Sequence, residues 1–308
     1  MLFRSRFEVL FIGPEDIVEK NLAAIGHDGA ACQIVNASEV IDMHDSATAA
    51  LKQKKDSSIT VGIMLQKEGR ADAFVSAGHT GAVLSASTLI LGRIDGVGRP
   101  TIGTFLPTEN GVCLLVDAGA NVDCKPQHLY EFAVMGSIYS NKMLDLKNPS
   151  VALLSIGEEK SKGNELTLEA YKLLSRSTLN FIGNVEGRDI LKGKANVVVC
   201  DGFVGNIVLK FAESVLDLLK TKIRGYAARG ISRKVWAGMM SGTLRSILKD
   251  LDYQEQGGVP LLGVNGVSII GHGKSTPKAM KNMIFKAEEM VRKNINRSIQ
   301  ETLQTVRG

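Results

Sequence analysis

The sequence of 308 residues contains few aromatic side chains, which make up 5% of it. This scarcity argues against a protein that stacks nucleic-acid bases on aromatic rings. The formal net charge of +5 is too small to indicate nucleic-acid binding by itself. It suits an acidic protein partner or an anionic membrane surface. We therefore predict no nucleic-acid partner.

The sequence also lacks the cysteine patterns of metal and disulfide proteins. Its four cysteines are widely spaced and form no CxxC pair, so neither a zinc site nor a disulfide framework is indicated. Reduced cysteines indicate a cytoplasmic protein. No apolar run of about 18 residues occurs, and the start does not read as a signal peptide, so we expect no membrane-spanning segment.

Short apolar runs alternate with helical patterns along most of the chain. This alternation predicts an α/β fold with a mostly parallel sheet flanked by helices, in a single domain over residues 1–308. The expected strands are 7–12, 31–35, 74–75, 101–106, 112–116, 151–156, 180–182 and 197–200, with a strand pair in 259–270. The main expected helices are 46–54, 57–69, 82–91, 126–146, 207–223 and 277–304, with another that ends near residue 174.

Four predicted strands end in the same way, with glycine and a polar side chain. These ends are residues 76–78, 117–119, 156–158 and 201–203. Functional groups in open α/β sheets collect at the carboxyl ends of strands, so we expect one shared crevice there.

The stretch from Asp72 to Thr108 organises the chain. A buried strand is followed by a turn of small residues, Ser76, Gly78, Thr80 and Gly81, and then by a helix. Backbone N–H groups at such a helix start favour an anion. The alternative is that the glycines only allow a tight turn between a strand and a helix.

Residues 210–252 contain no strand signal and predict a helical hairpin that projects from the sheet as an arm. Its basic and apolar residues could lie on an anionic bilayer or contact an acidic partner. The alternative is a dimer interface or core packing, and both uses can occur on different faces. The candidate contact residues are Lys220, Lys222, Arg224, Arg233, Lys234, Trp236, Met239, Met240 and Arg245.

Several motifs together resemble the PlsX family of phosphate acyltransferases. They occur in the order of that family from about residue 7 to residue 290, so the resemblance covers nearly the whole chain. The matching stretches are 54–58, 75–82, 99–100, 117–124, 135–136, 156–159, 162–163, 200–206, 257–258, 261–263 and 272–273.

The resemblance implies a fold like that of the isocitrate dehydrogenases and phosphotransacetylases. It implies transfer of a fatty acyl group from acyl-acyl carrier protein to inorganic phosphate, which gives acyl-phosphate for phospholipid synthesis. It further implies a homodimer, a cytoplasmic location at the inner face of the membrane, and a membrane glycerol-3-phosphate acyltransferase that takes the product. No metal or organic cofactor is implied.

Two departures from the family pattern stand out. The family usually opens with a strand that ends in an Asp-Ala-Met-Gly-Gly-Asp motif and then a helix, and this sequence contains neither. We expect an unpaired apolar sheet edge and a crevice without one wall as a result. His79 stands where the family more often has Asn, and both side chains can donate a hydrogen bond to an oxyanion.

The reaction needs groups that hold phosphate and stabilise a tetrahedral oxyanion rather than a strong base. For phosphate or oxyanion contacts we expect Ser76, Gly78, His79, Thr80 and Gly81. Around the thioester we expect Asn121, Asn206 and Lys162, and His272 as the acid that protonates the leaving sulfur. Three of these have a structural alternative: Asn121 as a turn amide, Lys162 as a solvated loop lysine and His272 as a packed or capping histidine.

Two other functions stay open at this point. A phosphotransacetylase that uses coenzyme A shares the reaction type and the fold group. An inactive scaffold would follow from the absent opening motif. An isocitrate-type dehydrogenase would need a carboxylate cluster for Mg²⁺ and several arginines, which the sequence does not show.

Overall fold

The computed structural model describes residues 7–26, 32–228, 230, 240, 242–243 and 257–307. Its main sheet has eight strands in the order β3-β10-β9-β4-β5-β8-β6-β7. In that order the strands are β3 (Ala73–Ser76), β10 (Val267–Ile270), β9 (Val259–Leu262), β4 (Thr101–Thr108), β5 (Gly111–Val116), β8 (Val197–Val199), β6 (Val151–Leu154) and β7 (Phe181–Val185).

A second, two-stranded sheet pairs β1 (Leu10–Gly13) with β2 (Gln33–Asn36) in parallel. β1 and β3 both lie under α3 (Ser58–Lys67), because a Cβ added at Gly62 would meet the side chains of Ile12 and Phe74. β3 is the first strand in the order of the large sheet, so one of its edges has no strand partner among the described residues.

The sheets are mixed but mostly parallel, which confirms the predicted fold class. Five of the eight described strand pairings are parallel. The three antiparallel pairings all involve β9 or β4, at the centre of the large sheet. The direction therefore reverses between the half that contains β3 and β10 and the half that contains β5, β8, β6 and β7.

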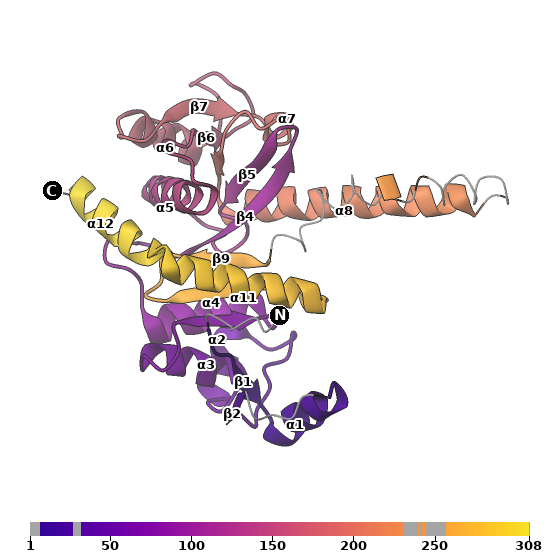
Figure 1. The fold of residues 1–308 in the computed structure, drawn as a ribbon. Helices are drawn as coiled ribbons and strands as arrows, with labels where there is room; N and C mark the ends of the chain where they lie inside the picture. The colour runs from indigo at the N-terminus through magenta and orange to yellow at the C-terminus, as the bar shows by residue number, and fades with distance from the viewer. Residues whose placement is uncertain are drawn as a thin grey trace.

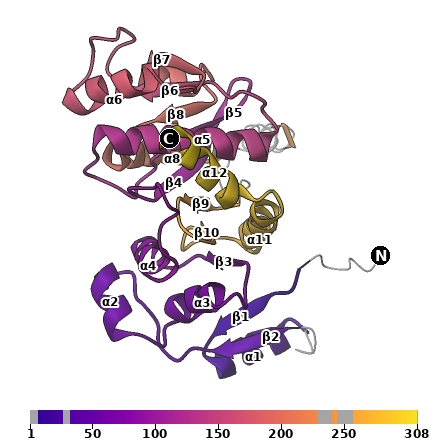
Figure 2. The ribbon, with the colours of Figure 1, turned by 90° about the vertical axis from the view of Figure 1, so that its left-hand side faces the viewer.

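Helices cover both faces of the large sheet (Figures 1 and 2). One face carries α5 (Pro126–Leu144), α6 (Glu165–Ser175), α11 (Pro277–Arg292) and α12 (Ile295–Arg307), whose buried residues share one core cluster. The other face carries α3 with α2 (Ala47–Gln53), α4 (Thr80–Ala86) and the π-helical turn η1 (Ser87–Leu91). Two short elements complete the fold, α1 (Glu15–Ala24) and α7 (Gly187–Ile190).

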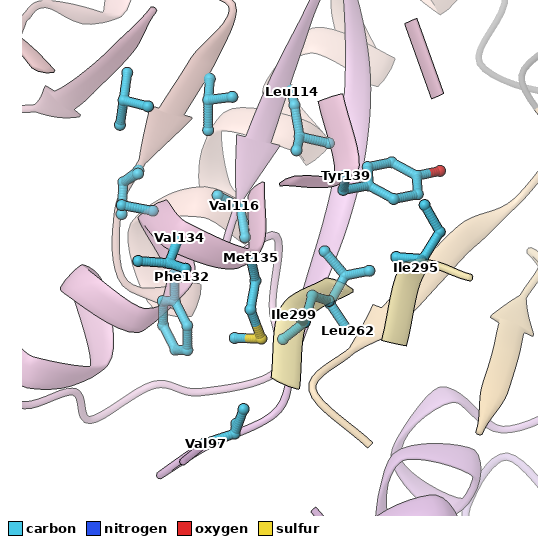
Figure 3. Close-up of a cluster of buried hydrophobic side chains, with 14 of the residues drawn as sticks. Val97, Leu114, Val116, Phe132, Val134, Met135, Tyr139, Leu262, Ile295 and Ile299 are labelled. Carbon is cyan, nitrogen blue, oxygen red and sulfur yellow. The ribbon is translucent and has the colours of Figure 1, made fainter. Parts of the chain in front are cut away.

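The largest core cluster lies between the sheet and α5. Met135 and Tyr139 on α5 are fully buried and pack with Leu114 and Val116 from β5 (Figure 3). Gly136 allows this close approach, because a Cβ there would come within 2.9 Å of Val197 Cγ1. α12 closes the cluster by packing on α5.

α8 (Gly202–Ala227) leaves the body of the protein and projects outward (Figure 1). Its 26 residues span about 39 Å at 1.5 Å per residue. It is the first limb of the predicted arm. Lys220, Lys222 and Arg224 lie on it, and Met240 is described in a turn. Arg233, Lys234, Trp236, Met239 and Arg245 lie outside the described residues.

Several predicted boundaries were wrong: β1 begins at Leu10, β6 ends at Leu154, and the helix predicted over 82–91 is α4 followed by η1. α8 begins at Gly202 rather than at residue 207, because the Asp201 side chain caps it by accepting from the Val204 N–H at 2.9 Å. The closing helix is two helices, because Asn294 adopts a left-handed conformation with φ of 51°. β7 continues through Gly183 and Asn184 to Val185, whereas we predicted its end at residue 182.

Candidate functional site

A pocket of about 380 Å³ lies where the ends of several strands meet. Its wall is formed by the residues that follow β3, β5 and β10 and by the first turns of α8. Of the four predicted strand ends, only residues 117–119 line the pocket themselves, through Ala118 and Gly119. Residues a few positions after two others do so as well: Thr80 and Gly81 after 76–78, and Asn206 after 201–203. The glycine turn after β6, residues 156–158, is not part of the lining, and the turn after β10 is.

The turn after β5 is held by the buried carboxylate of Asp117. Its Oδ1 accepts from the backbone N–H groups of Ile102, Gly119 and Ala120 at 3.0–3.2 Å. Its Oδ2 accepts from the backbone and side-chain nitrogens of Asn121, both at 2.8 Å. Burial raises the pKa of Asp117, while these donors act in the opposite direction. The carboxylate thus fixes the backbone that forms one wall of the pocket.

α8 packs directly on this turn through two glycines. The Gly202 N–H donates to the Asn121 carbonyl at 2.7 Å. A Cβ at Gly205 would lie 1.8 Å from the Asp117 carbonyl oxygen, so only glycine fits there. This close packing places Asn206 beside Gly119, at 3.4 Å from where a Cβ of that glycine would be.

Asn206, Lys210 and Glu213 all line the pocket from one face of α8. Their spacing of four and three residues places their side chains next to one another. Lys210 Nζ forms an ion pair with Glu213 Oε2 at 2.9 Å. Lys210 is a pocket residue that was not among the predicted site residues. Its position four residues after Asn206 was the signal that could have placed it in the site.

The turn after β3 contributes Thr80 and Gly81 to the pocket. Ser76 Oγ accepts from the Gly78 N–H at 3.1 Å and so shapes the turn. His79 caps α4, because its Nδ1 accepts from the Ala82 N–H at 3.2 Å. Its Nε2 lies 3.1 Å from the Asp45 carbonyl oxygen, which can only accept. In this arrangement both ring nitrogens of His79 have partners within the protein.

The turn after β10 contributes His272 and Ser275. The Lys274 N–H donates to His272 Nδ1 at 3.1 Å. A neutral His272 must therefore carry its proton on Nε2. Because the ring is exposed at the pocket wall, this Nε2–H can serve as a proton donor.

Two of the predicted catalytic residues lie outside the pocket lining. Asn121 uses its side-chain amide to donate to the Pro100 carbonyl at 2.7 Å and to Asp117, which is the structural role left open above. Lys162 is exposed on the loop after β6 and forms no salt bridge with the described residues. That loop follows β6, the strand next to β8.

The pocket has a polar side and an apolar side. Hydroxyl, amide, ammonium and imidazole groups come from Thr80, Asn206, Lys210, His272 and Ser275. Apolar side chains come from Leu84, Ile102, Leu209, Val259 and Ile270. Such a site can hold an anion beside the end of an apolar group.

Comparison with solved structures finds the same architecture in phosphotransacetylases. EutD phosphotransacetylase from Staphylococcus aureus matches with a TM-score of 0.60 and 19% sequence identity, over 92% of this chain and 86% of that one. A phosphotransacetylase from Streptococcus pyogenes matches with a TM-score of 0.59 and 20% identity, over 95% of this chain and 85% of that one. The fold is therefore of the phosphotransacetylase class.

The sequence defines the family within this class. The profile of the family described as "Fatty acid synthesis protein" matches residues 3–298. The phosphate acyltransferase of Heliobacterium modesticaldum is 52% identical over 96% of this chain and 88% of its own length. The phosphate acyltransferase of Desulforudis audaxviator is 49% identical over 94% of this chain and 85% of its own length. The chain belongs to this family, the PlsX phosphate acyltransferases, as the motifs predicted.

Proposed function

We propose that the pocket is the place where an acyl group passes from the thioester of acyl-acyl carrier protein to inorganic phosphate. The chain is a phosphate acyltransferase of fatty acid and phospholipid synthesis. The observation that supports this pocket as its site is the gathering of Thr80, Asn206, Lys210 and His272 around one cavity with an apolar side.

The reaction needs no redox change. A phosphate oxygen attacks the thioester carbonyl carbon, a C–O bond forms, and the carbonyl oxygen becomes an oxyanion. The tetrahedral intermediate then collapses, the C–S bond breaks, and the thiol of the carrier protein leaves with a proton. Because phosphate is already an anion at pH 7, binding and orientation carry most of the rate enhancement.

Each pocket residue suits one part of this reaction. The side-chain amide of Asn206 and the hydroxyl of Thr80 can donate hydrogen bonds to phosphate or to the oxyanion. Lys210 supplies positive charge, and its ion pair with Glu213 orients the ammonium group. The Nε2–H of His272 can protonate the departing sulfur.

The other predicted site residues are proposed to act around this centre. Ser76, Gly78 and Gly81 shape the turn whose backbone would face the phosphate. His79 holds that turn through its cap on α4. Asn121 holds the turn after β5. Lys162 is proposed to reach the phosphate or the thioester from the loop after β6.

We also propose the cellular setting that the family suggests. Three apolar residues of α8 have exposed fractions between 53% and 69%: Phe203, Ile207 and Phe211. Such an apolar surface suits a second copy of this chain in a homodimer, and the basic end of the arm suits the anionic inner face of the membrane. A membrane glycerol-3-phosphate acyltransferase would then take the acyl-phosphate. No helix in the described part of the chain combines the length and apolarity needed to cross a bilayer.

The test is acyl-phosphate formation from palmitoyl-acyl carrier protein and phosphate, followed by trapping the product with hydroxylamine. Palmitoyl-coenzyme A is assayed in parallel. Faster turnover of the carrier protein substrate is the expected result. Preference for coenzyme A would indicate the phosphotransacetylase alternative. No product from either thioester would overturn the proposal and favour the scaffold alternative.

A further inference from the structure

The last third of the chain contains a segment with positive charge only. Residues 257–287 include four lysines and neither Asp nor Glu. A segment without acidic residues is not by itself a positively charged surface, because its lysine side chains can point in different directions. The structure shows where these lysines lie.

Three of the four lysines are exposed at or just before the start of α11. Lys278 and Lys281 lie three residues apart on the helix, and Lys274 lies in the loop that leads into it. We call Lys274, Lys278 and Lys281 the lysine stripe. The opposite face of α11 is apolar and buried in the core through Ala279, Met283, Ala287 and Met290. All three stripe residues are exposed.

The lysine stripe borders the mouth of the pocket. His272, Ser275 and Ala279, which alternate with the stripe along the chain, line the pocket itself. A protein that covers the stripe would therefore present its own surface next to the site where the thioester must react.

The two end residues of the stripe, Lys274 and Lys281, carry charges that no salt bridge to the described residues neutralises. The first acidic residue beyond the stripe, Glu288, faces Arg292 at 3.6 Å instead. Lys281 Nζ lies 5.6 Å from the centroid of the Phe285 ring, which holds it near the surface of α11.

We infer that the lysine stripe is the docking surface for the acidic face of the acyl carrier protein, an inference that rests on the proposed function of the pocket. Carrier protein bound there delivers its thioester arm past His272. The electrostatic attraction speeds the encounter and orients the carrier protein, while the arm itself supplies contacts inside the pocket.

An acidic protein fits this surface better than a bilayer does. A helix that lies on a membrane inserts its apolar face between the lipids. The apolar face of α11 is already buried in the core. The exposed aromatic residue beside the stripe, Phe285, packs edge-on against Phe7 at 5.7 Å between ring centroids. The stripe therefore offers charge without a free apolar face.

The experiment compares a stripe variant with a charge-matched control in the full chain. The stripe variant is Lys278→Glu with Lys281→Glu, both on α11. The control is Lys172→Glu with Arg176→Glu at the end of α6, which packs on α5 and β7, far along the sheet from α11. Binding of fluorescently labelled holo-acyl carrier protein is measured by anisotropy. Turnover is measured with palmitoyl-acyl carrier protein and with an uncharged octanoyl-N-acetylcysteamine thioester.

The stripe variant leaves Lys274 and its contact to His272 unchanged. We expect it to bind carrier protein roughly tenfold more weakly or worse, and the control to bind as the unsubstituted protein does. KM for the acylated carrier protein should rise by a similar factor, whereas the uncharged thioester should turn over unchanged. Adding salt should weaken binding by the unsubstituted protein far more than by the stripe variant.

Other results would overturn the inference. They are equal carrier-protein affinity in the stripe variant and the unsubstituted protein, equal losses in the stripe variant and the control, or no binding in the unsubstituted protein. Vesicles of phosphatidylglycerol are tested by flotation as well. If the stripe variant loses vesicle binding and keeps carrier-protein affinity, the stripe is a lipid contact. If carrier protein binds the stripe and no acyl-phosphate forms from any thioester, the docking surface stands and the proposed function fails.

Discussion

The backbone N–H of Lys274 donates to Nδ1 of His272 at 3.1 Å, which leaves the proton of a neutral His272 ring on Nε2. This contact gives the histidine at the pocket wall a defined tautomer. A general acid needs its proton on the atom that faces the leaving group. The contact therefore makes the predicted role of His272 testable.

For His272→Gln we expect kcat with palmitoyl-acyl carrier protein to fall by roughly a hundredfold, because the leaving alkyl thiolate is no longer protonated. An aryl thioester releases a thiolate that needs no proton. With that substrate the loss should be tenfold or less. Equal losses with the alkyl and the aryl thioester would show that His272 positions the substrate and does not act as the acid.

For Asn206→Asp we expect kcat/KM to fall by about 10²–10³-fold, because a carboxylate replaces an amide donor beside an anionic substrate. Asn206 is exposed, so the melting temperature should change by little. Asn206→Ala should lower kcat/KM less than Asn206→Asp does, since it removes a hydrogen-bond donor without adding a negative charge that repels the substrate. An Asn206→Asp enzyme as active as the Ala variant would place the phosphate elsewhere.

Lys162 can be compared with a close neighbour. Lys162→Met should lower kcat/KM by tenfold or more if the ammonium reaches the phosphate, and Lys160→Met on the same exposed loop should have little effect. Initial rates at varied phosphate concentration measure both. Similar rates for the two variants would assign Lys162 to the solvated loop.

Replacing either of two glycines of α8 by alanine should change the stability of the protein, in opposite directions for the two positions. Gly205→Ala forces a methyl group to within 1.8 Å of the Asp117 carbonyl oxygen, so we expect a loss of at least about 2–3 kcal/mol in the free energy of unfolding. Gly225→Ala meets nothing within 4 Å and should stabilise the helix by about 0.5–1 kcal/mol. Urea denaturation of both variants checks this. A stable Gly205→Ala protein would contradict the tight packing of α8 on the turn after β5.

Lys286 should make stability depend on pH in an unusual direction. Burial lowers its pKa to about 7, and its Nζ donates to the Gly258 carbonyl at 2.8 Å. Below pH 7 both folded and unfolded chains carry the proton, so the full cost of burying the charge is present. Between pH 7 and about 10.4 only the unfolded chain keeps the proton on Lys286. The free energy of unfolding therefore rises with pH.

We expect this rise to be about 1–2 kcal/mol between pH 7 and pH 10, because part of the side chain still reaches solvent. Lys286→Met should abolish it. Lys293→Met is the control, because the hydrogen bond to Glu289 raises the pKa of Lys293 and moves its titration above this range. Urea denaturation at several pH values gives the differences. A parallel pH dependence in the unsubstituted protein and Lys286→Met would refute the expected shift.

Much of the site was predictable from local pattern. Strands, glycine turns and helix starts depend on neighbouring residues, so β3, β5 and β8 and the turns after them were found close to their actual positions. Asn206 and His272 were predicted and do line the pocket. The distant partners of Asn121 and His79 were not predictable, because they lie far away in the chain: Pro100 for Asn121 and Asp45 for His79.

The sequence alone determined the alternation of strands and helices, the glycine turns and the family, because each is written in short-range pattern and motif order. Only the tertiary structure decided which turns meet. The turn after β10 meets the turn after β5 and the start of α8 at the pocket, whereas the turn after β6 stays outside its lining although β6 runs parallel to β8. The tertiary structure also decided that Lys210 faces the pocket while Lys281 faces solvent, because burial depends on what packs against each helix face.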